Sequence, residues 1–251
     1  MAPQVQIIGV AGMPEVRPGD DLAALILQAA REQGAGIEDG DVLVVTQKIV
    51  SKAEGRLVDL RQVEPSPRAH EMAARTGKDA RLLEVILRES RRIVRQERGV
   101  IICETKHGFV CANAGVDTSN VGGGVVSLLP ENPDESAERI RVAIEEEKAG
   151  VSVAVIISDT FGRPWREGHT NVAIGLAGMR PVKDYVGQTD PHGYVLRVST
   201  MAVADELAAA AELVMEKLSR VPVAIVRGFD YQRREGSARE LIRPRERDLF
   251  R

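Results

Sequence analysis

One stretch of the sequence constrains the fold more than any other. Residues 151–157 are rich in Val and Ile and carry no charge. Such a run predicts a strand that is buried on both faces of a sheet. The polar and glycine residues of the segment 158–168 come directly after it. Because ligands of layered α/β proteins gather where such strands end, this segment is the first candidate for a reaction centre.

Asp159 and Thr160 stand at the end of this predicted strand. Their oxygen atoms suit a hard cation such as Mg²⁺ or Mn²⁺, and the guanidinium groups of Arg163 and Arg166 suit phosphate or carboxylate oxygens. The alternative is that Asp159 or Thr160 only caps a turn while the arginines are solvated. This segment by itself leaves both interpretations open.

The composition limits the class of protein. The 251 residues, 43% of them hydrophobic, suffice for one large core or two modest lobes. The formal net charge of -3 argues against a general nucleic-acid binder, because affinity for a phosphate backbone needs a positive excess. No signal-peptide pattern and no uncharged apolar stretch of spanning length occurs, so we expect a cytoplasmic protein without a membrane partner.

The cysteines and histidines predict neither a disulfide nor a zinc site. Cys103 and Cys111 lie in or beside apolar runs, which favours reduced core residues. The histidines are scattered and match no zinc-binding spacing.

The order of the predicted elements is mixed. Strands are expected over residues 4–10, 42–45, 57–60, 100–103, 108–112, 194–199 and 221–226, besides 151–157. Helices are expected after Asp20 or Asp21, after Pro65-Ser66-Pro67, on both sides of Thr76-Gly77, from Pro133 to Gly150 and over 204–218. This order predicts an α+β protein with mixed, largely antiparallel sheets and flanking helices. We expect a single domain over residues 1–251, with room for two lobes.

Residues 113–124 follow a predicted strand and are rich in small side chains. Asp117 would add a second carboxylate to a cation, Asn120 can hydrogen-bond a ligand, and the glycines at 122–124 would let backbone amides approach a phosphate. A flexible surface loop explains the three glycines at least as well.

Residues 46–55 follow the strand predicted at 42–45 and contain Lys48 and Lys52. The two lysines can pair with a polyphosphate, although a solvated face is the commoner fate of lysine. The segment is not a P-loop, because the chain lacks the pattern Gly, four residues, Gly-Lys-Ser/Thr. The loop 9–20, between a strand and a helix, can line a nucleotide pocket or be a plain connection.

The segments 12–21, 41–55, 113–120 and 158–163 together closely resemble the coenzyme F420-0:L-glutamate ligases. The resemblance continues through 171–175, 204–208 and 226–228, so it covers nearly the whole chain in order. It implies a ligase fold of the family's own, neither ATP-grasp nor P-loop, assembled as a homodimer. It also implies the stand-alone form, without the flavin reductase-like domain that other members carry at their C-terminus.

The resemblance implies the roles of individual residues. Asp117, Asp159 and Thr160 correspond to the divalent-metal ligands of the family. Its GTP contacts correspond to Met13, Pro14, Glu15, Val16, Gln47, Lys48, Lys52 and Asn120. An acidic metal ligand that some members have after their long C-terminal helix corresponds to Lys217 here, beside Glu216.

The activity implied by the resemblance is GTP-dependent addition of L-glutamate, by γ-linkage, to coenzyme F420-0 and then to F420-1. Phosphoryl transfer from GTP to the acceptor carboxylate would give an acyl phosphate that the glutamate amine attacks. Two Mg²⁺ or Mn²⁺ ions, with K⁺ as a further candidate, would neutralise charge while Lys52 or Lys48 steadies the phosphates. Asp159 and Lys52 are therefore the expected catalytic residues.

Two other classes of protein remain as alternatives. A metal-dependent phosphohydrolase would also place Asp159 and Thr160 beside a cation, but the Asp-x-Asp pattern of phospho-aspartyl enzymes is absent because residue 161 is Phe. A non-catalytic GTP-binding module would bind the nucleotide without turnover.

Overall fold

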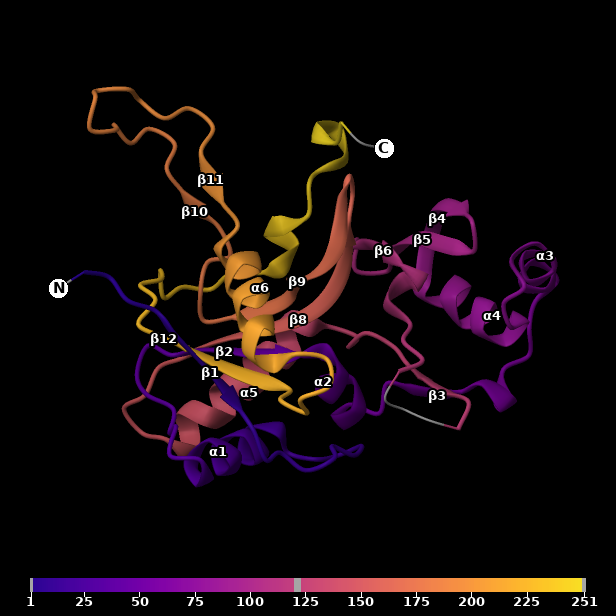
Figure 1. Ribbon diagram of the computed structural model, residues 1–251, viewed down its shortest axis with the longest axis horizontal. Coiled ribbons are helices and arrows are strands. Elements are labelled where there is room, and N and C mark those ends of the chain that lie inside the picture. Colours follow the sequence, from indigo (N-terminus) through magenta and orange to yellow (C-terminus); the bar gives the residue numbers. More distant parts are fainter. Residues whose placement is uncertain (1, 120–122, 250–251) are drawn as a thin grey trace.

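The computed structural model of the chain describes residues 2–119 and 123–249, and its central feature is a five-stranded sheet (Figure 1). The strand order is β1 (Gln6–Val10), β12 (Val223–Arg227), β2 (Val42–Thr46), β8 (Ala154–Arg163) and β9 (Arg166–Ala177). Strands β2 and β8 are parallel, whereas the other neighbouring pairs are antiparallel. The expected α+β fold with largely antiparallel sheets is confirmed.

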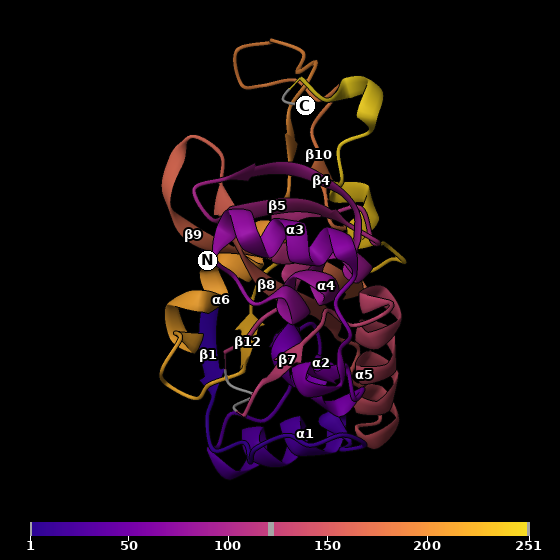
Figure 2. The same ribbon diagram turned by 90° about the vertical axis from the view of Figure 1, so that its right-hand side faces the viewer.

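Helices cover both faces of this sheet (Figures 1 and 2). On one face, α1 (Leu22–Glu32), α2 (Gln47–Ala53) and α5 (Pro133–Glu147) share a core with Leu43, Val45, Val155 and Ile157. On the other face, α6 (Val203–Met215) shares a core with Val42, Val44, Ala154 and Ile156. The side chains of successive residues in β2 and β8 therefore pack into the cores on opposite faces of the sheet. Because both faces are buried, both strands are continuous apolar runs.

A third core lies beside the sheet, on the right of Figure 1. It is built from β3 (Leu57–Asp59) paired with β7 (Val125–Ser127), the helices α3 (Pro67–Thr76) and α4 (Ala80–Glu89), and a sheet of β4 (Ser90–Glu97), β5 (Val100–Thr105) and β6 (Val110–Ala112). Cys103 and Cys111 are buried, free thiols on β5 and β6, as predicted.

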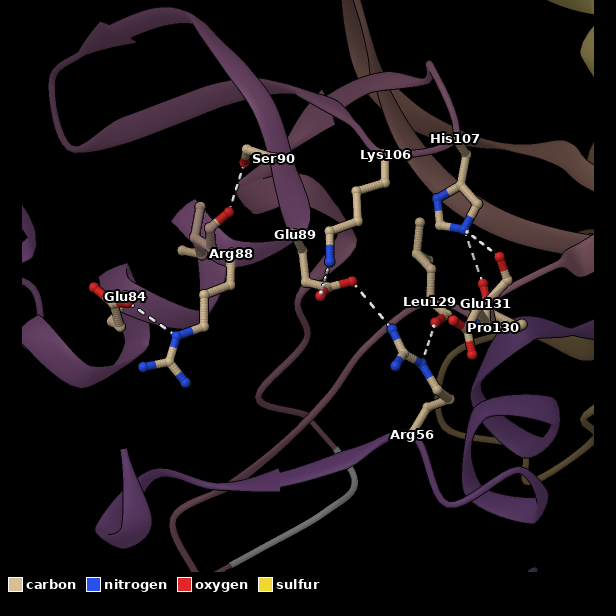
Figure 3. A network of polar contacts seen from close by, with 11 residues as sticks. Arg56, Glu84, Arg88, Glu89, Ser90, Lys106, His107, Leu129, Pro130 and Glu131 are labelled. Atoms are coloured by element: carbon tan, nitrogen blue, oxygen red, sulfur yellow. Dashed lines mark hydrogen bonds and ion pairs between the residues drawn. The ribbon is translucent and has the colours of Figure 1, made fainter. Parts of the chain in front are cut away.

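A network of polar contacts ties this third core to the segment that leads into α5 (Figure 3). The Glu89 carboxylate accepts hydrogen bonds from Arg56 at 3.1 Å and from Lys106 at 3.0 Å. Arg56 also donates to the carbonyl oxygen of Leu129 at 3.1 Å, and His107 Nε2 contacts that of Pro130 at 2.9 Å. These contacts join parts of the chain that are far apart in sequence.

The helix boundaries follow from local patterns. The side chain of Asp21 accepts a hydrogen bond from Ala24 N–H and caps α1. Ser66 caps α3, which has Pro67 in its first turn and ends at Gly77 with a left-handed φ of 70°. Four 3₁₀ turns complete the helices of the described chain: η1 (Leu60–Gln62), η2 (Asn113–Gly115), η3 (Ala238–Leu241) and η4 (Arg245–Arg247). Within residues 2–119 and 123–249, every helix is too short or too polar to span a bilayer.

Two predicted strands are corrected by the structure. Strand β8 begins at Ala154 and continues to Arg163, because β9 folds back and pairs with its polar half. Asp159 and Thr160 therefore lie inside a strand and cap no turn. Residues 194–199 are not a strand: Val195 forms only an isolated bridge with Thr189. They belong to an arm bounded by β10 (Lys183–Asp184) and β11 (Thr200–Met201), on which Val195 and Val198 are exposed.

Candidate functional site

The parallel pairing of β2 and β8 brings two candidate segments to one edge of the sheet. Thr46 and Ser158 are register partners, so the start of α2 lies beside the polar half of β8. Gln47 is buried there, and its side-chain oxygen accepts a hydrogen bond from Ser51 at 2.8 Å. Its side chain also hydrogen-bonds Asp159. The structure thus brings these two segments together.

Asp117 reaches the same place from the loop between η2 and β7. Its backbone pairs with Ser127 in both directions, at 2.9 and 3.0 Å. Lys48 Nζ lies 2.9 Å from Asp117 Oδ2 and donates to Ser119 Oγ at 2.7 Å. Burial by itself would raise the pKa of the Asp117 carboxyl, but the hydrogen bonds from Lys48 and Ser119 hold it below its ordinary value. Asp117 is therefore a fixed anion.

Asp159 is in a less favourable environment for a charge. Burial raises the pKa of Asp159 to about 7, and the nearby charge of Asp117 adds to this rise. The backbone N–H of Thr160, the charge of Lys48 and the side chain of Gln47 act in the opposite direction. Two carboxyl groups that are close together and poorly solvated favour a bound cation, which relieves both the repulsion and the loss of solvation.

The donor set fits a cation that completes its shell with other oxygens. No group of three or more His, Cys, Asp or Glu side chains suited to a metal occurs among the described residues. Mg²⁺ is commonly bound through one or two carboxylates together with waters and substrate phosphates. Asp117 and Asp159 match this pattern.

Thr160 is directed away from this pair. Successive side chains of a strand alternate between its faces, so Thr160 lies on the face of β8 opposite Asp159. Its hydroxyl donates to Asn171 Oδ1 on β9 at 2.8 Å, and Asn171 Nδ2 donates to Glu212 Oε2 on α6 at 2.9 Å. The resemblance groups Thr160 with Asp117 and Asp159, but the structure brings only the two aspartates together.

Sequence reasoning missed Asn171 and Glu212. Asn171 falls in the segment 171–175 that carries part of the resemblance, but no role was assigned to it, and Glu212 is one acidic residue of several on its helix. Their contacts depend on how α6 crosses β9, which no local pattern encodes.

The loop of residues 13–16 lies against α2. Lys52 Nζ pairs with Glu15 Oε1 at 2.5 Å, and the side chain of Lys52 is only 12% exposed whereas that of Glu15 is 77% exposed. Val16 is buried in the main core, where the partly buried Met13 also packs, and Pro14 is exposed. Lys52 and this loop thus form one surface. The remaining expected nucleotide contact, Asn120, is outside the described residues.

The other polar candidates lie away from the aspartate pair or are already bonded. The Arg163 guanidinium donates to the carbonyl oxygens of Glu167 and Gly168 within its own hairpin. Arg166 is exposed on the same hairpin. Glu216 and Lys217 are exposed after α6, and Glu216 accepts a hydrogen bond from Ser219.

Comparison with known proteins identifies the family. A family model described as F420-0:Gamma-glutamyl ligase matches residues 11–228. The chain is 50% identical over 250 residues to the coenzyme F420:L-glutamate ligase of Methanothermobacter thermautotrophicus, covering 98% of this chain and 99% of that one. It is 48% identical to the enzyme of that name from Methanopyrus kandleri, over 99% of this chain and 98% of the other. The one from Methanocaldococcus jannaschii is 44% identical, over 99% and 97%.

The matched region includes α2, the Asp117 loop and the β8–β9 hairpin, which together build the site described above. The family model matches most of the chain, and sequence identities of 44–50% over nearly the full length are higher than a shared fold alone would give. The chain therefore belongs to the F420-0:gamma-glutamyl ligase family, and it is a ligase that forms carbon–nitrogen bonds.

Proposed function

We propose that the protein uses GTP to attach L-glutamate by γ-linkage to coenzyme F420-0 and then to F420-1, through an acyl phosphate. The observation that carries this proposal is the convergence of Lys48, Asp117 and Asp159 at the ends of the parallel strands. A fixed cation and two carboxylates in a poorly solvated place suit phosphoryl transfer, where catalysis is mostly positioning and charge stabilisation. The names of the relatives supply the coenzyme and glutamate.

Asp117 and Asp159 would hold a divalent cation, Mg²⁺ or Mn²⁺, and Thr160 would bind a second one on its own face of β8, with K⁺ as a further candidate. Divalent cations supply charge neutralisation at the transferring phosphoryl group. The raised pKa of Asp159 fits this role, because a bound cation restores the charged form that burial disfavours.

The two lysines would act on the phosphates of GTP. Lys48 is already placed against Asp117, and Lys52 is nearly buried against Glu15. Because Glu15 is mostly exposed, Lys52 can exchange this partner for a phosphate at little cost. Gln47 and the loop 13–16 would contact the rest of the nucleotide, together with Asn120.

We also propose a homodimer that forms through the arm of residues 183–201. The arm projects from the body of the molecule (Figure 1). Apolar side chains on it are exposed: Val186 by 49%, Tyr194 by 59% and Val198 by 87%. An exposed group of apolar side chains on a projecting segment favours association with another surface.

Mass spectrometry of the reaction tests the proposed activity. The purified protein is incubated with F420-0, L-glutamate, GTP and Mg²⁺ or Mn²⁺, beside the variant Asp159→Ala and the control Asp230→Ala at an exposed carboxylate. We expect products that differ by successive glutamyl units, from the wild type and the control only. GTP consumption without glutamylated product would favour a phosphohydrolase, and GTP binding without turnover would favour a binding module.

A further inference from the structure

Strand β9 carries a bulge beside the candidate site. Ile157 pairs with Gly175, but the next residue of β8, Ser158, pairs with Ala173, so Ile174 is the additional residue. A bulge disrupts the ladder and changes the direction of nearby side chains. The backbone N–H of Ala173 donates to Asp205 Oδ1 at 2.9 Å, so the first turn of α6 satisfies it.

Helix α6 contacts β9 at a second point, about two turns further on. There Glu212 Oε2 accepts from Asn171 Nδ2 at 2.9 Å, and Asn171 Oδ1 accepts from the Thr160 hydroxyl at 2.8 Å. Asn171 is only 4% exposed, so water has little access to its amide. The orientation of the Thr160 hydroxyl is therefore linked to a carboxylate on α6.

Glu212 determines the direction of both hydrogen bonds. A carboxylate only accepts, so Asn171 must turn its NH₂ group toward Glu212 and its carbonyl oxygen toward Thr160. Because that oxygen carries no hydrogen, the Thr160 hydroxyl must donate to it. The lone pairs of Thr160 Oγ1 then remain available on its other sides. An oxygen binds a cation through a lone pair, so this is the orientation that a metal-binding hydroxyl needs.

We propose that Asn171 and Glu212 are positioning residues that orient the Thr160 hydroxyl as a ligand for a divalent cation. This inference rests on the proposed function, in which Thr160 binds such a cation. Partners of this kind fix the orientation of metal ligands, and their loss commonly lowers metal affinity about 10- to 100-fold.

Mn²⁺ binding, followed by the electron paramagnetic resonance signal of the free ion in the presence of GDP, tests the proposal without turnover. We expect Glu212→Gln to weaken binding about 10-fold, because a glutamine lets the Asn171 amide turn and the Thr160 proton point at the cation. Thr160→Val should weaken it at least as much. Glu206→Gln, at an exposed position of the same helix, is the matched control and should bind as the wild type does.

A double-mutant cycle separates orientation from charge. If Glu212 acts through Thr160, adding Glu212→Gln to Thr160→Val should cause no further loss. The pair Asn171→Asp with Glu212→Gln should regain affinity, because an aspartate accepts from Thr160 and the glutamine amide can donate to it. Melting curves of each variant check that it is folded.

Four results would overturn the proposal, and they differ in which parts of the proposed function they also exclude. A further 10-fold loss in the Thr160→Val background would mean that Glu212 acts by its charge or through stability. Wild-type affinity in Glu212→Gln, with weak binding in Thr160→Val, would remove the positioning role alone. Wild-type affinity in Thr160→Val, or no Mn²⁺ binding by the wild type, would remove the cation role of Thr160 from the proposed function as well.

Discussion

Two features of the metal-free protein disfavour the charged form of Asp159. Its position on β8 places it beside Asp117, whose charge repels its own, and burial deprives it of water. A residue of this kind lowers the stability of the folded chain whenever it is ionised. A bound cation would offset this cost, and the cost itself can be tested through the pH dependence of stability.

We predict that Asp159→Asn stabilises the metal-free protein at high pH only. The pKa of Asp159 is about 7 in the folded protein against an ordinary value of 3.8, so between these pH values the folded state keeps a proton that the unfolded chain has lost. The free energy of unfolding therefore falls as pH rises from about 4 to about 7 and then levels off. The variant lacks this loss, so its melting temperature should exceed that of the wild type at pH 8 and match it near pH 4.

Scanning calorimetry in the presence of a chelator measures this difference. Asp230→Asn, at an exposed carboxylate, should show no such trend. A gain for Asp159→Asn that is the same at pH 4 and pH 8 would mean that the carboxyl is well solvated.

Strand β8 illustrates how much of an element can be predicted from sequence. Its buried half follows from the apolar run, and the polar residues after two such runs drew attention to Lys48 and Asp159, whereas its pairing with β2 became visible only in the structure. Its extension to Arg163 was not predictable, because it depends on pairing with β9. The same limit explains residues 194–199, whose apolar side chains suggest a strand but find no continuous partner.

The contact between β9 and α5 gives a prediction at the scale of elements. A Cβ on Gly175 would lie 2.4 Å from the carbonyl carbon and oxygen of Pro133, the first residue of α5. Backbone cannot move aside as a flexible side chain can, so Gly175→Ala should force α5 away from the sheet. We predict that this lowers the free energy of unfolding by about 1–3 kcal/mol. Gly162→Ala, where a Cβ would meet nothing within 4 Å, is the control.

Urea denaturation compares the two glycine variants. The urea concentration at the midpoint of unfolding should fall for Gly175→Ala and stay close to that of the wild type for Gly162→Ala. The dependence of the unfolding free energy on urea concentration should be similar for all three proteins. Equal midpoints for both variants would show that α5 adjusts to the added methyl group without cost.

On the scale of the whole molecule, the third core depends on the contacts in Figure 3 for its attachment near α5. Glu89 is 11% exposed and pairs with both Arg56 and Lys106, so Glu89→Ala leaves two cations without their partner. We predict a loss of about 1–3 kcal/mol in the free energy of unfolding, because Arg56, whose side chain is only 26% exposed, loses its charged partner. The exposed pair of Arg95 and Glu97 provides the control, because Glu97→Ala should change stability by less than about 1 kcal/mol. Thermal unfolding measures both variants, and an equal loss of stability in Glu89→Ala and Glu97→Ala would contradict a special role for Glu89.

The arm of residues 183–201 gives the last prediction, because its exposed apolar side chains have no evident role in an isolated chain. Val198 is 87% exposed, and a charge placed there would be buried without a partner if a second copy covers the arm. We therefore expect light scattering after size exclusion to give a dimer for the wild type and a monomer for Val198→Asp. Val100→Asp, at a 51% exposed position outside the arm, should remain a dimer. A wild-type monomer would refute the dimer, and a dimeric Val198→Asp would place the interface elsewhere.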